Sequence, residues 1–280
     1  MGNAFTWGVS WWPFRQLQDH GVHPLWSTAL VYAMAALALL ALRPAAWRGF
    51  GQHPGLWILL LAAGLTNIGF NWAVTIGDVV RVVLLFYLMP AWSVLLAWPL
   101  LGEKPSAGSL GRLALALLGV VIVLKSPESA WPWPHTLADG LAVMGGFSFA
   151  LTNVMLRRLH TAPTSASMLA MFSGGTVMGG LAAVGGLHGG LVNALPALDA
   201  SWLVWVVGLS LFFLLGNMGL QYGAARLNAS TTSTIMLAEV VFASSSALLL
   251  GAGELSPRIV LGGSLVLLAA LLSTVSVSQN

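Results

Sequence analysis

Long runs of apolar residues make up most of the chain, and proline, glycine and charged residues separate them. A helix needs roughly 20 apolar residues to cross a bilayer. The pattern predicts ten such spans, at about residues 3–18, 24–42, 55–77, 80–101, 107–125, 137–157, 163–186, 200–224, 228–251 and 257–277. The runs are too long and too rich in Leu and Ala for the alternating strands of a barrel. We therefore predict an all-α membrane protein.

The composition agrees with this interpretation. The 280 residues are 58% hydrophobic and only 7% charged, whereas a soluble domain carries roughly 25% charged residues. The connections are short, the longest being 126–136, so no soluble domain is expected. The N-terminus has no basic region and no small-residue cleavage site, so we expect the first apolar segment to be retained as a helix. The absence of cysteine excludes disulfides, thiolate metal sites and cysteine catalysis.

The Lys and Arg residues predict an orientation. With a cytoplasmic N-terminus, seven of them face inward: Arg43, Arg48, Lys104, Arg112, Arg157, Arg158 and Arg226. Four face outward: Arg15, Arg81, Lys125 and Arg258. Cytoplasmic loops attract positive charge, so both termini are predicted to be cytoplasmic. Arg15 and Asp19 lie about one helical turn apart, as do Arg81 and Asp78. Both pairs are expected to be local ion pairs at helix ends.

Two stretches of the chain align without a gap. LTNIGFNWAVTIG, residues 65–77, shares Leu, Asn and Gly positions with LGNMGLQYGAARL, residues 215–227. Two further pairs repeat in the same order: WGVSW (7–11) with GFSF (146–149), and LLGEKPS (100–106) with AGELSP (252–257). Residues 1–130 and 131–280 are therefore predicted to be two five-helix repeats of one membrane domain. Because five is odd, the second copy enters the membrane inverted, and the repeats surround a central cavity.

Side-chain amides stand where this repeat predicts a substrate site. Asn67 and Asn71 share a helical face within an uncharged run, and the repeat pairs them with Asn217 and Gln221. Substrate sites of inverted-repeat transporters lie at such a midplane interface. The predicted substrate-binding residues here are Asn67, Asn71, Trp72, Asn217, Gln221 and Tyr222. The alternative is that these amides only join helices, at about 0.6 kcal/mol per interhelical hydrogen bond.

The first predicted span adds three candidates. Trp7 and Trp11 lie one turn apart with Ser10 close by. An aromatic-lined cavity holds planar side chains and attracts an ammonium group through cation–π interaction. We predict that Trp7, Ser10 and Trp11 line one wall of the cavity, with packing against lipid or core as the alternative for each ring.

A single carboxylate, Glu239, lies inside the ninth predicted span. An ionised carboxylate there costs about 2.5–3.5 kcal/mol on insertion scales, so we expect Glu239 to be neutral at pH 7. It is either a structural hydrogen-bonding group or a residue that couples transport to protons or binds an ammonium.

The sequence contains no metalloprotease, nucleophile-elbow or phosphate-loop motif, and its six histidines are dispersed. We therefore expect no catalysis, no cofactor and no metal. A net charge of +3 without a basic run does not indicate nucleic-acid binding. The expected partners are a small-molecule substrate and the lipid bilayer, with the chain a monomer or weak oligomer.

Ten spans in two inverted halves, the Trp7-Gly8-x-Ser10 segment and Gly-Glu turns before Gly-bearing spans resemble the drug/metabolite transporter superfamily, EamA-type. The clearest match runs from Pro90 to Glu103 and on through KPSAGSLGRLALALLGVVIVL. The whole chain is most similar to the YddG-type exporters, a resemblance that implies aromatic amino-acid substrates and a bacterial cytoplasmic membrane. The family often has Glu-Pro in its ninth helix, where this chain has Glu239-Val240.

The sequence therefore predicts a secondary transporter that exports amino acids, including aromatic and other neutral ones, by alternating access. Phosphorylated substrates are disfavoured because no Lys or Arg lies deep in a span. The alternative is an exporter of hydrophobic cationic drugs or other metabolites, for which Glu239 is the candidate carboxylate. A membrane scaffold or enzyme is a third hypothesis, disfavoured by the midplane amides and the lack of catalytic groups.

Overall fold

The computed structural model describes residues 2–124, 134–224, 229–254 and 256–277, and these residues form helices and no strands. Within the helices, several side chains, including those of 220–224 and 229–238, lie outside the description. The α-helices are α1 (Gly2–Val9), α2 (Trp11–Asp19), α3 (Pro24–Leu42), α4 (Gly49–Gln52), α5 (Gly55–Ile76), α6 (Val79–Phe86), α7 (Met89–Leu101), α8 (Ala107–Leu124), α9 (Leu137–Arg158), α10 (Thr164–His188), α11 (Ala200–Ala224), α12 (Ala229–Leu249) and α13 (Pro257–Val277). A short 3₁₀ helix, η1 (Pro44–Arg48), precedes α4.

Among the described residues, six helical segments are long and apolar enough to cross a membrane. They are Pro24–Leu42, Gly55–Ile76, Val79–Leu101, Leu137–Arg158, Thr164–His188 and Ala200–Gly219. Large apolar side chains such as Leu37, Leu61, Leu181 and Leu268 are exposed on the bundle, as expected for a surface that meets lipid rather than water. Every predicted span overlaps a described helix, while the count of ten crossings and the inverted repeat remain predictions.

Two predicted spans are broken helices rather than continuous ones. The first divides at Ser10 into α1 and α2, and the fourth divides at Tyr87 and Leu88 into α6 and α7. A proline follows each break, at Pro13 and Pro90. Proline has no N–H for the carbonyl four residues earlier and is tolerated in the first turn of a helix. Each proline therefore favours a new helix over the continuation of the old one.

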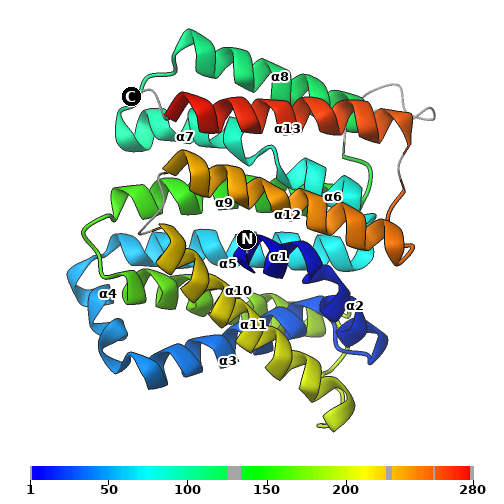
Figure 1. The fold of residues 1–280 in the computed structure, drawn as a ribbon. Coiled ribbons are helices and arrows are strands. Elements are labelled where there is room, and N and C mark those ends of the chain that lie inside the picture. Colours follow the sequence, from blue (N-terminus) through cyan, green and yellow to red (C-terminus); the bar gives the residue numbers. More distant parts are fainter. Residues whose placement is uncertain (1, 125–133, 225–228, 255, 278–280) are drawn as a thin grey trace.

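The predicted repeats pack intimately against each other. The closest helix–helix packing pairs α5 with α9 and α10, α8 with α13, and α3 with α10, and α8 lies beside α13 at one edge of the bundle (Figure 1). At Gly69 of α5, an added Cβ atom would lie 2.7 Å from the carbonyl oxygen of Leu141 in α9. At Gly119 of α8, it would lie 2.6 Å from the carbonyl oxygen of Gly262 in α13. Glycines thus bring backbones of the two predicted repeats into direct contact.

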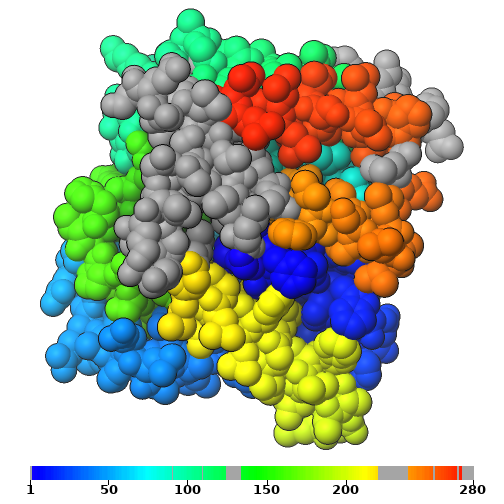
Figure 2. All heavy atoms as spheres, in the orientation of Figure 1, coloured from blue at the N-terminus to red at the C-terminus, as the bar shows by residue number. Residues whose placement is uncertain are grey.

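Most residues of helix α1 are buried or partly buried against neighbouring helices, while Phe5 is exposed. The helix packs against α11 on one side and α12 on the other, and in Figure 2 its dark blue atoms are visible only between the yellow and orange segments. An added Cβ atom at Gly8 would lie 2.8 Å from the carbonyl oxygen of Glu239. This close approach places the candidate aromatic residues of the first span next to helices of the second predicted repeat.

Candidate functional site: an aromatic junction and two polar clusters

Trp7 stands at the meeting point of three helices. Its ring centroid lies 6.0 Å from that of Phe70 in α5 and 4.7 Å from that of Phe213 in α11. Phe213 in turn stacks on Tyr32 of α3, with centroids 5.4 Å apart. We call Trp7, Tyr32, Phe70 and Phe213, with Asn71, the aromatic junction. It joins α1, α3, α5 and α11, which lie far apart in the sequence.

Asn71 supplies the polar side of the aromatic junction. Its side chain is fully buried, and its Nδ2 donates to Thr28 Oγ1 of α3 at 3.2 Å. The Tyr32 hydroxyl lies close enough to the Asn71 side chain to interact with it, yet neither that hydroxyl nor Asn71 Oδ1 has a partner that meets full hydrogen-bonding geometry. A buried polar group without a partner costs about 1–3 kcal/mol. The aromatic junction therefore contains one acceptor and one hydroxyl for which the protein supplies no well-formed hydrogen bond.

The neighbours of Asn71 on α5 occupy different surroundings. Asn67 is buried and shares the helical face of Gly64, where an added Cβ atom would lie 2.6 Å from the carbonyl oxygen of Gly174 in α10. Trp72 lies edge-to-face with His23, at 5.3 Å between centroids. His23 Nδ1 accepts from the backbone N–H of Leu25 at 3.2 Å. Burial lowers the pKa of His23, which favours the neutral ring that this cap requires.

The break at Ser10 separates the two tryptophans of the first span. Ser10 is fully buried and its hydroxyl donates to the carbonyl of Trp7 at 2.9 Å. Trp11 is also buried, and its Nε1 donates to Ser246 Oγ of α12 at 2.9 Å. Trp7 therefore belongs to the aromatic junction, whereas Ser10 and Trp11 serve contacts within the protein in this arrangement.

The predicted symmetry mates of the α5 amides lie on α11. The Nδ2 of Asn217 donates to the carbonyl of Phe213, one turn earlier on the same helix, at 3.0 Å. Asn217 is only partly buried, unlike Asn71. The side chains of Gln221 and Tyr222 lie outside the described residues. The structure thus brings Asn71 and Trp7 to one aromatic junction and leaves the pairing with Asn217 as a prediction.

Glu239 of α12 is buried, with 8% of its surface exposed. Its Oε2 accepts a hydrogen bond from the Tyr87 hydroxyl at 3.4 Å. Tyr87 is the residue at which the fourth span breaks between α6 and α7. The carboxyl group therefore accepts from a hydroxyl donor of the other predicted repeat. This contact fits a structural role for Glu239 and does not conflict with a role in coupling transport to protons.

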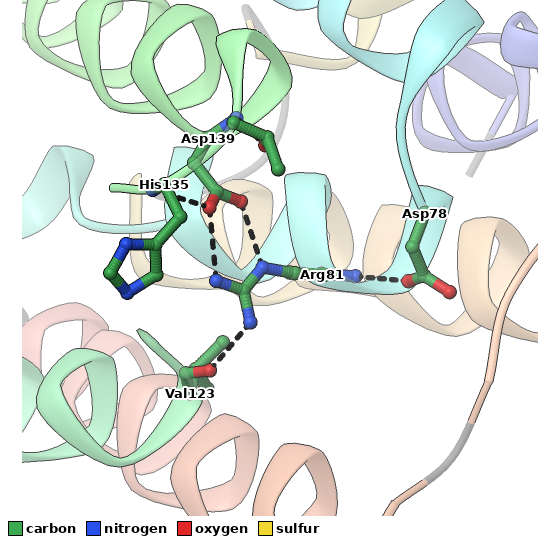
Figure 3. Close-up of polar contacts among 6 residues, drawn as sticks. Asp78, Arg81, Val123, His135 and Asp139 are labelled. Carbon is green, nitrogen blue, oxygen red and sulfur yellow. Dashed lines mark hydrogen bonds and ion pairs between the residues drawn. The ribbon is translucent and has the colours of Figure 1, made fainter. Parts of the chain in front are cut away.

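A second polar cluster joins the start of α6 to the start of α9 (Figure 3). Arg81 Nε donates to Asp139 Oδ1 at 2.8 Å and Arg81 Nη2 donates to Asp139 Oδ2 at 3.0 Å. Arg81 Nη1 also donates to the carbonyl of Val123 at 2.8 Å. The Arg81 side chain is 24% exposed and that of Asp139 only 2%. This two-pronged geometry is typical of strong Arg–carboxylate pairs.

Both predicted local ion pairs are wrong. Asp78 caps α6 by accepting from the backbone N–H of Arg81 at 2.7 Å, while the Arg81 guanidinium pairs with Asp139. Arg15 donates to the carbonyls of Val74 and Gly77 at the end of α5, and its guanidinium lies 5.1 Å from the centre of the Trp11 ring. Unpaired carbonyls at the end of a helix attract such cations, and sequence spacing alone does not reveal them.

Sequence reasoning missed five residues of these clusters. Tyr32, Phe70 and Phe213 were not separated from other aromatic residues, and neither Tyr87 nor Asp139 was a predicted site residue. One signal was available: Asp139 is an acid in an apolar span, as Glu239 is. Within the described part of the chain, no group of three or more His, Asp or Glu side chains could hold a metal ion.

Comparisons with known proteins support a membrane transporter. Residues 1–125, just under half of the chain, match the model of the EamA-like transporter family. The match and the apolar helices support a multi-pass membrane protein that transports small molecules. A solved crystal structure is similar over 99% of this chain and 96% of its own, with 18% identity and a TM-score of 0.56. At this identity, the likeness concerns the fold alone. No curated protein matches the chain.

Proposed function

We propose that this protein is a secondary transporter that exports amino acids, including aromatic and other neutral ones, across a bacterial cytoplasmic membrane by alternating access. The two predicted repeats, 1–130 and 131–280, would move relative to each other around a site that includes the aromatic junction. The EamA-like match of residues 1–125 supports transport, and the chemistry of the aromatic junction supports this substrate class.

The observation that carries the proposal is the pair of buried polar atoms, Asn71 Oδ1 and the Tyr32 hydroxyl oxygen, that have no well-formed hydrogen bond. Asn71 Oδ1 can accept from a substrate ammonium, and the Tyr32 hydroxyl can donate to a carboxylate. The rings of Trp7 and Phe213 beside them offer flat apolar surfaces and cation–π attraction. A zwitterion with a planar side chain uses all of these groups.

A second candidate function rests on Glu239. A buried carboxylate attracts a cation, so a hydrophobic cationic drug is the alternative substrate class. Uptake of radiolabelled amino acids and of fluorescent hydrophobic cations into proteoliposomes separates the two. We expect saturable flux of phenylalanine, tryptophan and neutral aliphatic amino acids, with no flux of cations. Flux of the cations alone would favour the second function.

Replacing Asn71 with alanine is expected to weaken transport. Without the Asn71 amide, the substrate group that it pairs with is left without a partner. This loss weakens binding by roughly 1–3 kcal/mol, which is about 5- to 150-fold in affinity. We expect the initial flux at low substrate to fall at least several-fold. The melting temperature in detergent should change little, because Asn71 makes only one hydrogen bond through its side chain.

Asn217→Ala is the matched control for Asn71→Ala, because the Asn217 amide donates to its own helix. A smaller loss of flux is expected there. The site hypothesis loses its support if Asn71→Ala melts early but discriminates among amino acids as the parent protein does.

Glu239→Gln is expected to retain most of the transport and its pH profile. Glutamine keeps an oxygen that accepts from the Tyr87 hydroxyl, so the contact between α12 and the α6–α7 break persists. Glu239→Leu removes the acceptor and should lower the melting temperature more. Flux across a range of pH values checks this, and a folded Glu239→Gln protein without transport would instead show proton or cation coupling.

A further inference from the structure

Polar contacts join the two predicted repeats where α6 begins, the predicted outer end of the bundle. Arg81 of α6 pairs with Asp139 of α9 through two hydrogen bonds. Asp78 Oδ2 accepts from the backbone N–H of Glu254, after α12, at 2.8 Å. The backbone N–H of Val79 donates to the carbonyl of Ala252 at 3.2 Å. We call this set the latch: Asp78, Val79, Arg81, Asp139, Ala252 and Glu254.

The opposite end of the bundle is joined differently. There, Arg157 at the end of α9 pairs with Glu103, after α7. These side chains are 60% and 49% exposed, and exposed ion pairs contribute roughly 0–1 kcal/mol. Among the described residues, the partly buried ion pair between the repeats is therefore the one in the latch (Figure 3).

A surface pocket of about 500 Å³ lies directly beside the latch. Its lining residues include Trp11 and Arg15 of α2, Thr75 of α5 and Ala252 after α12. Ala252 belongs to the latch, and Trp11 crosses to α12 through its hydrogen bond with Ser246. The pocket thus touches the latch at Ala252 and a second contact between the predicted repeats at Trp11.

The latch and the glycine contacts respond differently to separation. At Gly69 of α5, an added Cβ atom would lie 2.9 Å from the Cα of Gly145 in α9. Parting these two backbones would open an apolar void, which is costly because nothing refills it. Parting Arg81 from Asp139 exposes charged groups that water solvates: the Arg81 side chain is already 24% exposed, and that of Asp139, which is 2% exposed, is hydrated as the joint opens. The glycine contacts therefore suit a fixed pivot, and the latch suits a joint that opens.

On this basis, and resting on the proposed function, we propose that the latch is the closed outer gate of the transporter, and that Arg81 and Asp139 are positioning residues of the transport cycle. Opening the latch joins the surface pocket to the interior and releases substrate outward. Closing it restores the bidentate pair and the two backbone contacts with the turn after α12. The latch must open once in every cycle.

A disulfide across the latch tests this, and the chain has no cysteine of its own. A Cβ atom at Gly253 would lie 3.6 Å from the Cβ of Val80 in α6, within the range of about 3.5–4.5 Å that disulfides span. In Val80→Cys/Gly253→Cys, oxidation is expected to slow flux by about tenfold or more, because gate opening limits the cycle. Reduction should restore it.

The matched control is Ala247→Cys/Gly253→Cys, which shares one cysteine but lies within the second repeat. The Cβ at Gly253 would lie 3.3 Å from that of Ala247, slightly closer than that range, so loss of free thiols on oxidation must first show that this pair forms its disulfide. Its flux should be the same before and after oxidation. If the fully oxidised Val80→Cys/Gly253→Cys protein transports at the normal rate, the proposal that the latch is a gate is wrong.

A second measurement needs no substrate, so it separates failure of the gate from failure of the proposed function. Val80 is 2% exposed, and a maleimide reaches Val80→Cys only when the latch opens. Adding Asp139→Asn should raise its labelling rate in detergent by about tenfold or more. Ala35→Cys, 1% exposed on α3, should label at an unchanged rate, which excludes general unfolding. Equal labelling of Val80→Cys with and without Asp139→Asn would overturn the latch, whatever the protein transports.

Discussion

Replacing Arg81 with alanine is expected to lower the free energy of unfolding by about 3–5 kcal/mol, because it leaves a buried carboxylate uncompensated. The Asp139 side chain is 2% exposed, so water cannot take the place of the guanidinium without structural change. Two hydrogen bonds from Arg81 to Asp139 and one to Val123 are lost together. Thermal melting in detergent should show a large drop.

Asp139→Asn is the informative counterpart. The guanidinium left behind is 24% exposed, keeps its bond to the Val123 carbonyl and can reach water. Asparagine can still accept from the backbone N–H of His135, as Asp139 Oδ2 does at 3.2 Å. The drop in melting temperature should therefore be clearly smaller than for Arg81→Ala. The double variant Arg81→Ala/Asp139→Asn should melt at a higher temperature than Arg81→Ala alone, since the buried carboxylate charge is gone. Equal losses in both single variants would contradict this account.

Gly174→Ala is expected to destabilise the bundle by about 3 kcal/mol, at the upper end of overpacking costs. The added Cβ atom would lie 2.1 Å from the carbonyl oxygen of Leu60 and 2.8 Å from the backbone N of Gly64. Both neighbours are backbone atoms of α5, which cannot turn away as a side chain can. Helices α5 and α10 would have to separate along their contact.

Gly180→Ala on the same helix provides the control. No described atom lies within 4 Å of a Cβ added there. Alanine favours a helix over glycine by roughly 0.5–1 kcal/mol, so this variant should melt at the same temperature or slightly higher. Melting curves of the two purified variants check the prediction, and similar curves would show that α10 does not depend on its contact with α5.

Helix positions could be predicted because the hydrocarbon core of the membrane constrains each segment of the chain separately. A segment in lipid must satisfy its own backbone, so a run of about 20 apolar residues becomes a helix whatever surrounds it. The predicted span 24–42 and α3 coincide. The breaks at Ser10 and Tyr87 were not predicted, because a proline inside an apolar run either bends a helix or divides it. Neighbouring helices decide between the two.

The candidate site was predictable in part. Asn71 was singled out because an amide in an uncharged run needs a partner, and it is indeed buried. The partner itself could not be predicted: Thr28 lies 43 positions away, on another helix with several polar residues. Arg81 illustrates the opposite error. The nearest acid in sequence was expected to pair with it, yet the pairing acid lies 58 positions further on.

The sequence by itself determined that this protein is an all-helical membrane protein, where most of its helices lie, and that a few polar residues stand at membrane depth. These properties follow from apolar run length and from the cost of burying polar groups, which act on each segment separately. Only the tertiary structure decided which polar groups meet. Asn71 with Tyr32, Tyr87 with Glu239 and Arg81 with Asp139 come from different helices. The register and rotation of packed helices set those meetings, through glycine contacts that no single segment encodes.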